Sequence, residues 1–299
     1  MRTSYRNSHE PPNVWLYDGV GSFGRRRGRE IVTLLEVADV EVRFGGISAL
    51  RGIDITVDPG TVTGLIGPNG AGKTTTFNVI CGLQSVANGR VVLDGTDLQG
   101  MRPHRRARLG IARTFQRLEI FGSLTVFENV LVAAEIHRRV SRDRSNPKAA
   151  TSEILELVGL RHMADEAAET LPTGLARLVE LGRALASCPS VLLLDEPSSG
   201  LDETESDALG DLLLRLAAQN MAILLVEHDV ELVMRVCSLI HVLDFGRILA
   251  VGSPEQIRSD ERVRAAYLGT EDDVEVADGP DVDAPPPGQA FGKVLSANV

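Results

Sequence analysis

One stretch of nine residues constrains the fold of this chain more than any other. It fits the pattern G-x-x-x-x-G-K-[ST] and consists of Gly67, Pro68, Asn69, Gly70, Ala71, Gly72, Lys73, Thr74 and Thr75. Glycines allow backbone N–H groups to point at phosphate oxygens without a Cβ in the way. Lys73 supplies a positive charge for the β- and γ-phosphates, and the Thr74 hydroxyl can ligate Mg²⁺. The stretch therefore predicts a nucleotide phosphate site.

The flanking sequence supports this interpretation. Residues 62–66 form a short apolar run that predicts a buried strand, and residues 77–80 continue a helical pattern. The alternative is a glycine-rich turn that merely happens to contain a lysine. A strand before the loop and a helix after it disfavour that alternative, because the N-terminal end of the helix adds its own attraction for the anion.

Composition excludes several classes of protein. The 299 residues are 43% hydrophobic and 24% charged, which is typical of a globular protein with one large domain or two modest ones. No apolar run approaches the ~18 residues that a transmembrane helix needs. The net charge of −10 argues against a nucleic-acid-binding protein. Three scattered cysteines fit a reducing compartment and indicate neither a zinc site nor disulfides.

The two ends differ in composition from the middle. Residues 1–30 are polar and rich in Gly, Pro and Arg, so we expect a flexible leader. Residues 31–269 should form the ordered domain. Residues 270–299 are acidic and contain three consecutive prolines, which predicts a disordered tail.

Between these ends, strand patterns flank a helical region. Residues 35–44 predict an edge strand, and further strands are expected at 53–57 and 90–95. Residues 98–172 have mainly helical periodicity. Two almost wholly apolar runs, 191–194 and 222–226, are typical of central strands in a parallel sheet covered on both faces. The pattern predicts an α/β nucleotide-binding core interrupted by a helical insertion.

Four polar residues are candidates for chemistry around the phosphate loop. Asp195 and Glu196 follow the apolar strand at 191–194, where one can hold Mg²⁺ and the other can activate a water molecule. Gln116 follows the core segment and can touch both metal and water. His228 follows the strand at 222–226 and can position the water. Taken singly, each could equally be a solvated acid, a surface amide or a structural histidine.

Order and spacing over residues 34–269 resemble the ATP-binding cassette (ABC) ATPases. Residues 171–175 precede a helix expected at 176–186, and residues 199–202 follow the two acids. The resemblance implies an α/β P-loop NTPase core with a mainly parallel sheet, an antiparallel β edge region and an inserted helical subdomain at about 98–172. It also implies ATP and Mg²⁺ as ligands, with ATP hydrolysis as the activity.

The same resemblance implies roles for individual residues. Thr74, Gln116 and Asp195 would hold Mg²⁺, while Glu196 would be the catalytic base and His228 the switch residue. Phe44 matches the aromatic residue that stacks on adenine. Thr173 and Gly174 belong to the signature loop, which in this family binds the γ-phosphate in the opposite subunit, and Asp202 matches a loop that communicates across the dimer.

The signature loop departs from the family pattern L-S-G-G-Q. Here Pro172 and Leu175 remove the usual serine hydroxyl and glutamine amide. Thr173 can supply a hydroxyl one position later, and the following helix N-terminus remains. We expect a working ATPase that is slow or asymmetric, which leaves open a homodimer or a heterodimer with a different cassette.

Residues 115–130 and 246–269 resemble the corresponding regions of branched-chain amino-acid importer ATPases. If the resemblance holds, two transmembrane permease subunits bind the cassettes, and residues 117–135 receive a permease helix at the cytoplasmic face of the membrane. Urea or amide importers and the lipopolysaccharide exporter are similar. A soluble ABC protein and a weakly hydrolysing regulatory cassette are the remaining alternatives.

Overall fold

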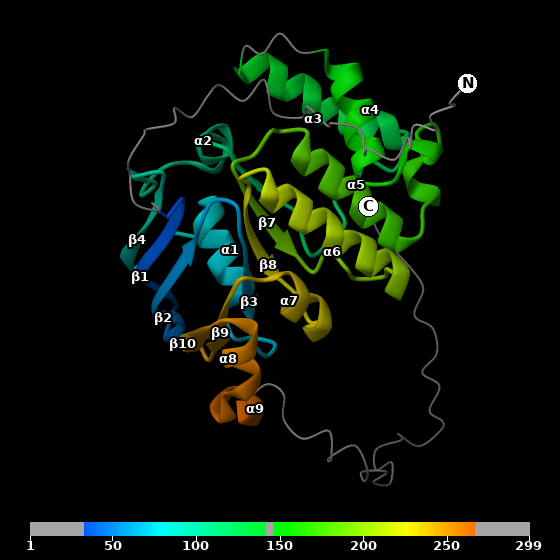
Figure 1. Ribbon diagram of the computed structural model, residues 1–299. Helices are drawn as coiled ribbons and strands as arrows, with labels where there is room; N and C mark the ends of the chain where they lie inside the picture. The colour runs from blue at the N-terminus through cyan, green and yellow to red at the C-terminus, as the bar shows by residue number, and fades with distance from the viewer. Residues whose placement is uncertain (1–32, 142–145, 267–299) are drawn as a thin grey trace, which may run out of the picture.

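The computed structural model describes residues 33–141 and 146–266 (Figure 1). The expected leader at 1–30 and the expected tail at 270–299 lie outside the described residues. The described part contains two sheets, a group of helices between residues 103 and 185, and further helices around the larger sheet. Within these ranges, no helix is both long and apolar enough to cross a membrane.

The larger sheet has six strands in the order β10-β9-β3-β8-β7-β6. Neighbouring strands are parallel except for β9 and β10. Every residue of β3, β7 and β8 is buried, which explains why these segments are continuous apolar runs. The strands are β3 (Val62–Ile66), β6 (Ile111–Arg113), β7 (Val191–Asp195), β8 (Ala222–Val226), β9 (Leu239–Asp244) and β10 (Arg247–Gly252).

The smaller sheet is antiparallel, with the order β2-β1-β4-β5. Its strands are β1 (Leu35–Phe44), β2 (Ile47–Val57), β4 (Asn88–Leu93) and β5 (Thr96–Asp97). The prediction that β1 is an edge strand was wrong, because β4 pairs with its free side and aligns Leu93 with Leu35. Alternation along β1 reports one buried face, and that pattern does not distinguish an inner antiparallel strand from an edge. Together the two sheets confirm the predicted fold class.

The helical region between the strands contains α2 (Pro103–Arg108), α3 (Val126–Ser141), α4 (Pro147–Leu157) and α5 (Thr173–Leu185), with short 3₁₀ turns at Arg161–Met163 and Ala168–Thr170. Strand β6 lies within the same stretch of sequence but pairs with β7 in the larger sheet. Helix α5 begins three residues before the predicted 176, because Pro172 is its N-cap. Proline has a fixed φ and no N–H to satisfy, so it suits the start of a helix.

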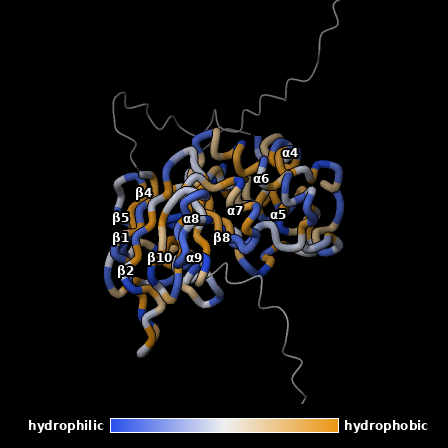
Figure 2. The backbone as a smooth tube through the Cα atoms, turned by 60° about the horizontal axis from the view of Figure 1, so that its bottom comes forward, coloured by the Kyte–Doolittle hydropathy of each residue, from blue (hydrophilic) through white to orange (hydrophobic). Residues whose placement is uncertain are grey.

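Two apolar cores hold these layers together. One lies between the two sheets around α1 (Lys73–Cys81), whose Phe77 is fully buried. The other joins the opposite face of the larger sheet to α3, α4, α5, α6 (Glu203–Ala218) and α7 (Val230–Val236). The chain continues through α8 (Pro254–Ser259) and α9 (Glu261–Ala266) beside β10. Figure 2 shows apolar segments running through the inner strands, with hydrophilic segments along many outer loops.

The C-terminal end of α1 is held by an arginine. Arg106, on α2, is buried and donates to the carbonyl oxygens of Val79, Ile80, Leu98 and Met101 at 2.8–3.0 Å. Two of these carbonyls belong to the last turn of α1, where a positive charge is favourable. The helix that follows the phosphate loop is therefore fixed at its far end by α2.

Candidate active site

The phosphate loop joins β3 to α1, and two of its glycines are required by their surroundings. Gly67 has φ 150°, and a Cβ there would lie 1.9 Å from the carbonyl oxygen of Leu243. Gly72 has φ 117° and is the N-cap of α1, where a Cβ would lie 2.7 Å from Cδ2 of Leu50. Neither position has room for a side chain, so the sequence pattern of the loop follows from its close contact with the rest of the core.

Lys73 is the first residue of α1 and is folded back over the loop. Its ammonium group donates to the carbonyl oxygens of Gly67 at 2.5 Å and Pro68 at 3.1 Å. Burial lowers the pKa of Lys73, and the nearby carboxylates of Glu196 and Asp195 counteract this shift. No side chain caps the N-terminal end of α1. A lysine and the N–H groups of a helix start therefore meet at one place, which is the chemistry of an anion site.

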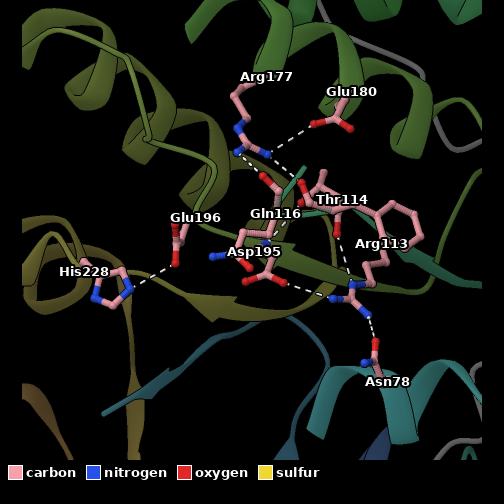
Figure 3. A network of polar contacts seen from close by, with 10 residues as sticks. Asn78, Arg113, Thr114, Gln116, Arg177, Glu180, Asp195, Glu196 and His228 are labelled. Atoms are coloured by element: carbon pink, nitrogen blue, oxygen red, sulfur yellow. Dashed lines mark hydrogen bonds and ion pairs between the residues drawn. The ribbon is translucent and has the colours of Figure 1, made fainter. Parts of the chain in front are cut away.

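The carboxylate of Asp195 is buried at the end of β7 and is paired with Arg113, at the end of β6. Arg113 Nη2 lies 3.0 Å from Asp195 Oδ2, and both side chains are almost fully buried. The Asp195 backbone N–H also donates to the hydroxyl of Thr114 at 3.1 Å. Burial raises the pKa of Asp195, while the Arg113 guanidinium counteracts the shift. Figure 3 shows this pairing below Gln116.

Glu196 follows Asp195 with φ 51°, a left-handed backbone conformation that is uncommon for a residue with a side chain. Its backbone N–H donates to the carbonyl oxygen of Val226, at the end of β8. The turn places Glu196 Oε1 3.0 Å from His228 Nε2 (Figure 3). This contact is a hydrogen bond when Nε2 carries the proton. The two residues expected to act on water thus lie together, although 32 positions separate them in sequence.

Glu227 contacts the loop after Glu196 and the backbone of His228, and no sequence motif predicted it. Its buried carboxylate accepts hydrogen bonds from the backbone N–H groups of Ser198 at 2.7 Å and His228 at 3.1 Å. Burial raises the pKa of Glu227, and these backbone donors counteract the shift. The carboxylate therefore ties the loop after Glu196 to the residue that contacts it. The only signal in the sequence is its place directly before His228.

Gln116 is exposed, and its backbone rather than its side chain is held in place. Arg177, on α5, donates to the carbonyl oxygens of Phe115 at 2.5 Å and of Gln116 (Figure 3). Arg177 also lies 3.4 Å from the carboxylate of Glu180, whose other oxygen accepts from the Glu119 backbone N–H. Burial raises the pKa of Glu180. The start of α5 and the Gln116 loop are thus joined by a buried ion pair, which the sequence analysis did not predict.

The structure places the signature residues beside the loop that follows Glu196. A Cβ on Gly174 would lie 2.5 Å from the carbonyl oxygen of Gly200, so this glycine is required by a close backbone approach. Thr173 is exposed, and no side chain caps α5. Asp202 caps α6, and its carboxylate accepts from the Glu205 N–H at 2.8 Å. Asp202 therefore has a structural role in addition to any role in an interface.

Several of the predicted residues form one group, and the others lie at the end of β1, at the start of α5 and, for Asp202, at the N-cap of α6. Lys73, Asp195, Glu196, Gln116 and His228 gather at the carboxyl ends of parallel strands, where α/β proteins bind ligands. Phe44 is half exposed at the end of β1, and Thr173 and Gly174 are the first two residues of α5.

Oxygen donors suitable for Mg²⁺ are present in this group and directly beside it. They are the exposed hydroxyl of Thr74, the amide of Gln116 and the buried carboxylate of Asp195. Residues 33–141 and 146–266 contain no cluster of three or more His, Cys, Asp or Glu that would hold a metal alone. Mg²⁺ typically uses one or two carboxylates together with substrate phosphates and water, so the donor set fits a nucleotide-bound magnesium.

Comparison with known proteins gives consistent matches. Residues 50–199 match the family described as ABC transporter, and residues 247–273 match the family described as branched-chain amino acid ATP-binding cassette transporter. The high-affinity branched-chain amino acid transport ATP-binding protein BraF of Pseudomonas aeruginosa is 39% identical over 249 residues, covering 79% of this chain and 98% of BraF.

An exporter subunit and a solved structure are also similar. The lipopolysaccharide export system ATP-binding protein LptB of Haemophilus influenzae is 34% identical over 238 residues, covering 80% of this chain and 98% of LptB. The crystal structure of an ATP-binding cassette of an ABC transporter in its ADP conformation superposes with a TM-score of 0.71 at 31% identity. It covers 80% of this chain and 100% of that chain.

Proposed function

This chain belongs to the ABC transporter family of ATP-binding proteins, and from that premise we propose that it hydrolyses ATP to drive uptake of branched-chain or related amino acids. The observation that carries the proposal is the 3.0 Å contact between Glu196 and His228 beside the phosphate loop. A carboxylate and an imidazole at this position can hold and deprotonate a water molecule, which a binding-only cassette does not need.

The reaction follows from the residues around the loop. Lys73 exchanges its bonds with the Gly67 and Pro68 carbonyls for oxygens of the β- and γ-phosphates. Water attacks the γ-phosphorus, the bond to the β,γ-bridging oxygen breaks, and ADP and phosphate leave. Glu196 accepts the proton from the water, and His228 orients both Glu196 and the γ-phosphate.

Magnesium would be held by Thr74, Asp195 and Gln116, and Phe44 would stack on the adenine. When bound, Mg²⁺ neutralises charge on the β- and γ-phosphates. Thr74 lies one residue after Lys73, and the carboxylate of Asp195 is paired with Arg113 at 3.0 Å. The ring of Phe44 is half exposed and thus accessible to a base.

The site is completed by a second cassette subunit. Thr173 and Gly174 at the start of α5 would bind the γ-phosphate in the partner, and Asp202 would lie at the interface. The support is physical: α5 has 13 residues, its N-terminal end has no side-chain cap, and Thr173 is exposed. Pro172 and Leu175 weaken this end, which favours pairing with a different cassette that supplies a complete signature.

In each of the two cassettes, a groove between α2 and α5 would receive a helix from one of two transmembrane permease subunits. A cavity of about 410 Å³ lies there, with Leu83, His104 and Phe115 among its lining residues. Leu83 and Phe115 are exposed apolar side chains, which suit the apolar face of a partner helix. The chain would therefore lie peripherally at the cytoplasmic face of the membrane.

The transported solute separates the two candidate systems. Similarity to LptB favours lipopolysaccharide export, whereas the match of residues 247–273 to the branched-chain amino acid family favours import. We give the importer priority for two reasons. Residues 247–273 match the branched-chain amino acid family outside the general ABC transporter match at 50–199, and BraF is more similar to this chain than LptB is.

Uptake of radiolabelled leucine, isoleucine and valine by cells that lack this chain tests the proposal. We expect uptake to fall and to return with the wild-type gene but not with Lys73→Ala. Unchanged uptake together with altered lipopolysaccharide at the cell surface would contradict the importer and support the exporter.

A further inference from the structure

Arg113 connects three parts of the molecule. It is at the end of β6, with a side chain that is almost fully buried. Its guanidinium donates to Asp195 Oδ2 at 3.0 Å, to Asn78 Oδ1 at 2.6 Å and to the carbonyl oxygen of Thr114 at 3.2 Å (Figure 3). Asn78 belongs to α1, the helix of the phosphate loop. One side chain thus joins that helix to the carboxylate at the end of β7.

Two aromatic rings restrict the guanidinium further. Its central carbon lies 5.2 Å from the ring centre of Phe77 and 5.0 Å from that of Phe115. Phe77 is fully buried in the core, whereas Phe115 is exposed at the groove. A planar guanidinium can stack on aromatic rings while its N–H groups bond in its own plane, and a lysine ammonium cannot do both.

These contacts give a buried carboxylate a positively charged partner and a fixed orientation. Asp195 is 2% exposed, so its charge would be costly without a partner. Arg113 engages Oδ2 and leaves Oδ1 for another ligand. Groups that hydrogen-bond a metal-binding carboxylate orient it and tune its affinity for the metal, although they do not touch the metal.

The groove lies on the other side of the same residue. Arg113, Thr114 and Phe115 all line the cavity of about 410 Å³. Thr114 accepts a hydrogen bond from the Asp195 backbone, so two consecutive residues of the groove wall bond directly to Asp195. Phe115 at the groove therefore contacts Arg113, and Arg113 contacts the carboxylate.

We propose that Arg113 is a positioning residue that orients the Asp195 carboxylate for magnesium and connects it to the groove. This inference rests on the proposed function, because that function includes a magnesium held by Asp195. On this proposal, the gain in nucleotide affinity that Mg²⁺ provides depends on Arg113. A helix bound in the groove influences the metal through its contact with Phe115.

The test is calorimetric titration of the full chain with ADP, once with Mg²⁺ and once with EDTA. The dissociation constant in EDTA divided by the dissociation constant in Mg²⁺, here called the magnesium ratio, measures how much magnesium strengthens ADP binding. In Arg113→Lys we expect this ratio to fall about 10- to 100-fold, as for other partners of metal-binding carboxylates, with affinity in EDTA unchanged. The matched control is Arg183→Lys, because Arg183 lines the same cavity and stacks on Phe121 without contacting Asp195.

Two further variants keep the test decisive if Arg113→Lys does not fold. Asn78→Ala removes the anchor on α1 but leaves the ion pair, and Phe115→Ala removes the exposed ring. We expect a smaller fall of the magnesium ratio in each. An unchanged ratio in Arg113→Lys and Asn78→Ala would overturn the positioning role, and an unchanged ratio in Phe115→Ala would overturn the connection to the groove.

Equal loss of affinity with and without magnesium in Arg113→Lys would also overturn the inference, since Arg113 would then support only the phosphate loop. If the wild-type chain binds ADP equally well in Mg²⁺ and in EDTA, the proposed magnesium site itself fails. The two failures are therefore distinguishable.

Discussion

The phosphate loop and the start of α5 both present a helix N-terminus to solvent, but their surroundings differ. At the phosphate loop, Gly67 and Gly72 fit against Leu243 and Leu50, and Lys73 bonds to the loop itself. At the start of α5, an exposed Pro172 and Thr173 precede the helix without a capping side chain.

The difference shows which half of the nucleotide site the chain completes alone. The phosphate loop is shaped by buried contacts within this chain, so its geometry exists before any ligand binds. The start of α5 has its backbone fixed by Gly200 and by Arg177, but its first residue Thr173 and the preceding Pro172 are exposed. We therefore expect substitutions in the first region to be severe in this chain itself. Substitutions at the start of α5 should have smaller effects on activity, and these effects should depend on the partner subunit.

The largest effect should come from Glu196→Gln. We expect ATP hydrolysis to fall about 10²- to 10⁴-fold, because the amide cannot accept a proton from water. Nucleotide binding should persist, because Glu196 contacts His228 rather than the phosphate loop. Phosphate release and equilibrium ATP binding measure the two. Glu203→Gln, at an exposed acid on α6, is the control, and retained hydrolysis in Glu196→Gln would refute the assignment.

The rigidity of the phosphate loop is tested by Gly67→Ala. A Cβ 1.9 Å from the Leu243 carbonyl forces the backbone to move, so we expect the free energy of unfolding to fall by about 2–4 kcal/mol in urea titrations. Gly70→Ala is the matched control. It has φ 80° but no atom within 4 Å of a Cβ, so only backbone strain of about 1 kcal/mol is expected. Equal losses would mean that close contact is not what shapes the loop.

A buried histidine makes the core behind the phosphate loop sensitive to acid. His241 lies on β9 opposite Leu65 of β3, and burial lowers its pKa from 6.5 to about 4. Between these values the unfolded chain binds a proton that the folded chain excludes. Stability is therefore unaffected above pH 6.5 and is lost as the pH falls from 6.5 towards 4.

His241→Leu should remove this acid-dependent loss of stability, which amounts to about 2 kcal/mol between pH 6.5 and pH 5. Melting temperature as a function of pH, compared between wild type and variant, measures it. The raised pKa values of Asp195 and Glu227 act in the opposite direction and cancel in the difference between the two proteins. Parallel curves would show that His241 is not the titrating group.

The smallest effect concerns the start of α5. Replacing Pro172 with Ser and Leu175 with Gln restores the family's hydroxyl and amide, and we expect turnover to rise about 2- to 10-fold, as one or two neutral hydrogen bonds allow. Steady-state ATP hydrolysis measures it. The same pair of substitutions combined with Glu196→Gln should stay inactive. An unchanged or lower rate would mean that Pro172 and Leu175 are not what limits turnover.

The fold was largely predictable because its strongest signals are local. Apolar runs at 191–194 and 222–226 became β7 and β8, and the phosphate loop joins a strand to a helix as predicted. The position of β1 was not predictable, because its second neighbour, β4, comes from beyond α1 in the chain. Periodicity reports which face of a strand is buried and not which strand lies next to it.

The candidate site was predictable for residues that belong to a recognisable pattern and not for those that support them. Arg113, Arg177 and Glu227 act through contacts with residues 29 to 82 positions away. A lone arginine or glutamate in sequence is most often a solvated side chain. Only folding shows that these three are buried and bonded, and what they hold in place.

Arg106 imposes an unequal tolerance to substitution on α2. Five of the six residues in this helix are exposed and make no comparable set of buried contacts, but the guanidinium at position 106 serves four carbonyl groups at once. Lysine has three donors on a single atom and cannot reach them all, so even the most conservative exchange would leave the end of α1 with unpaired carbonyls. Among related sequences, position 106 should therefore drift far more slowly than its neighbours, as if it belonged to the phosphate loop.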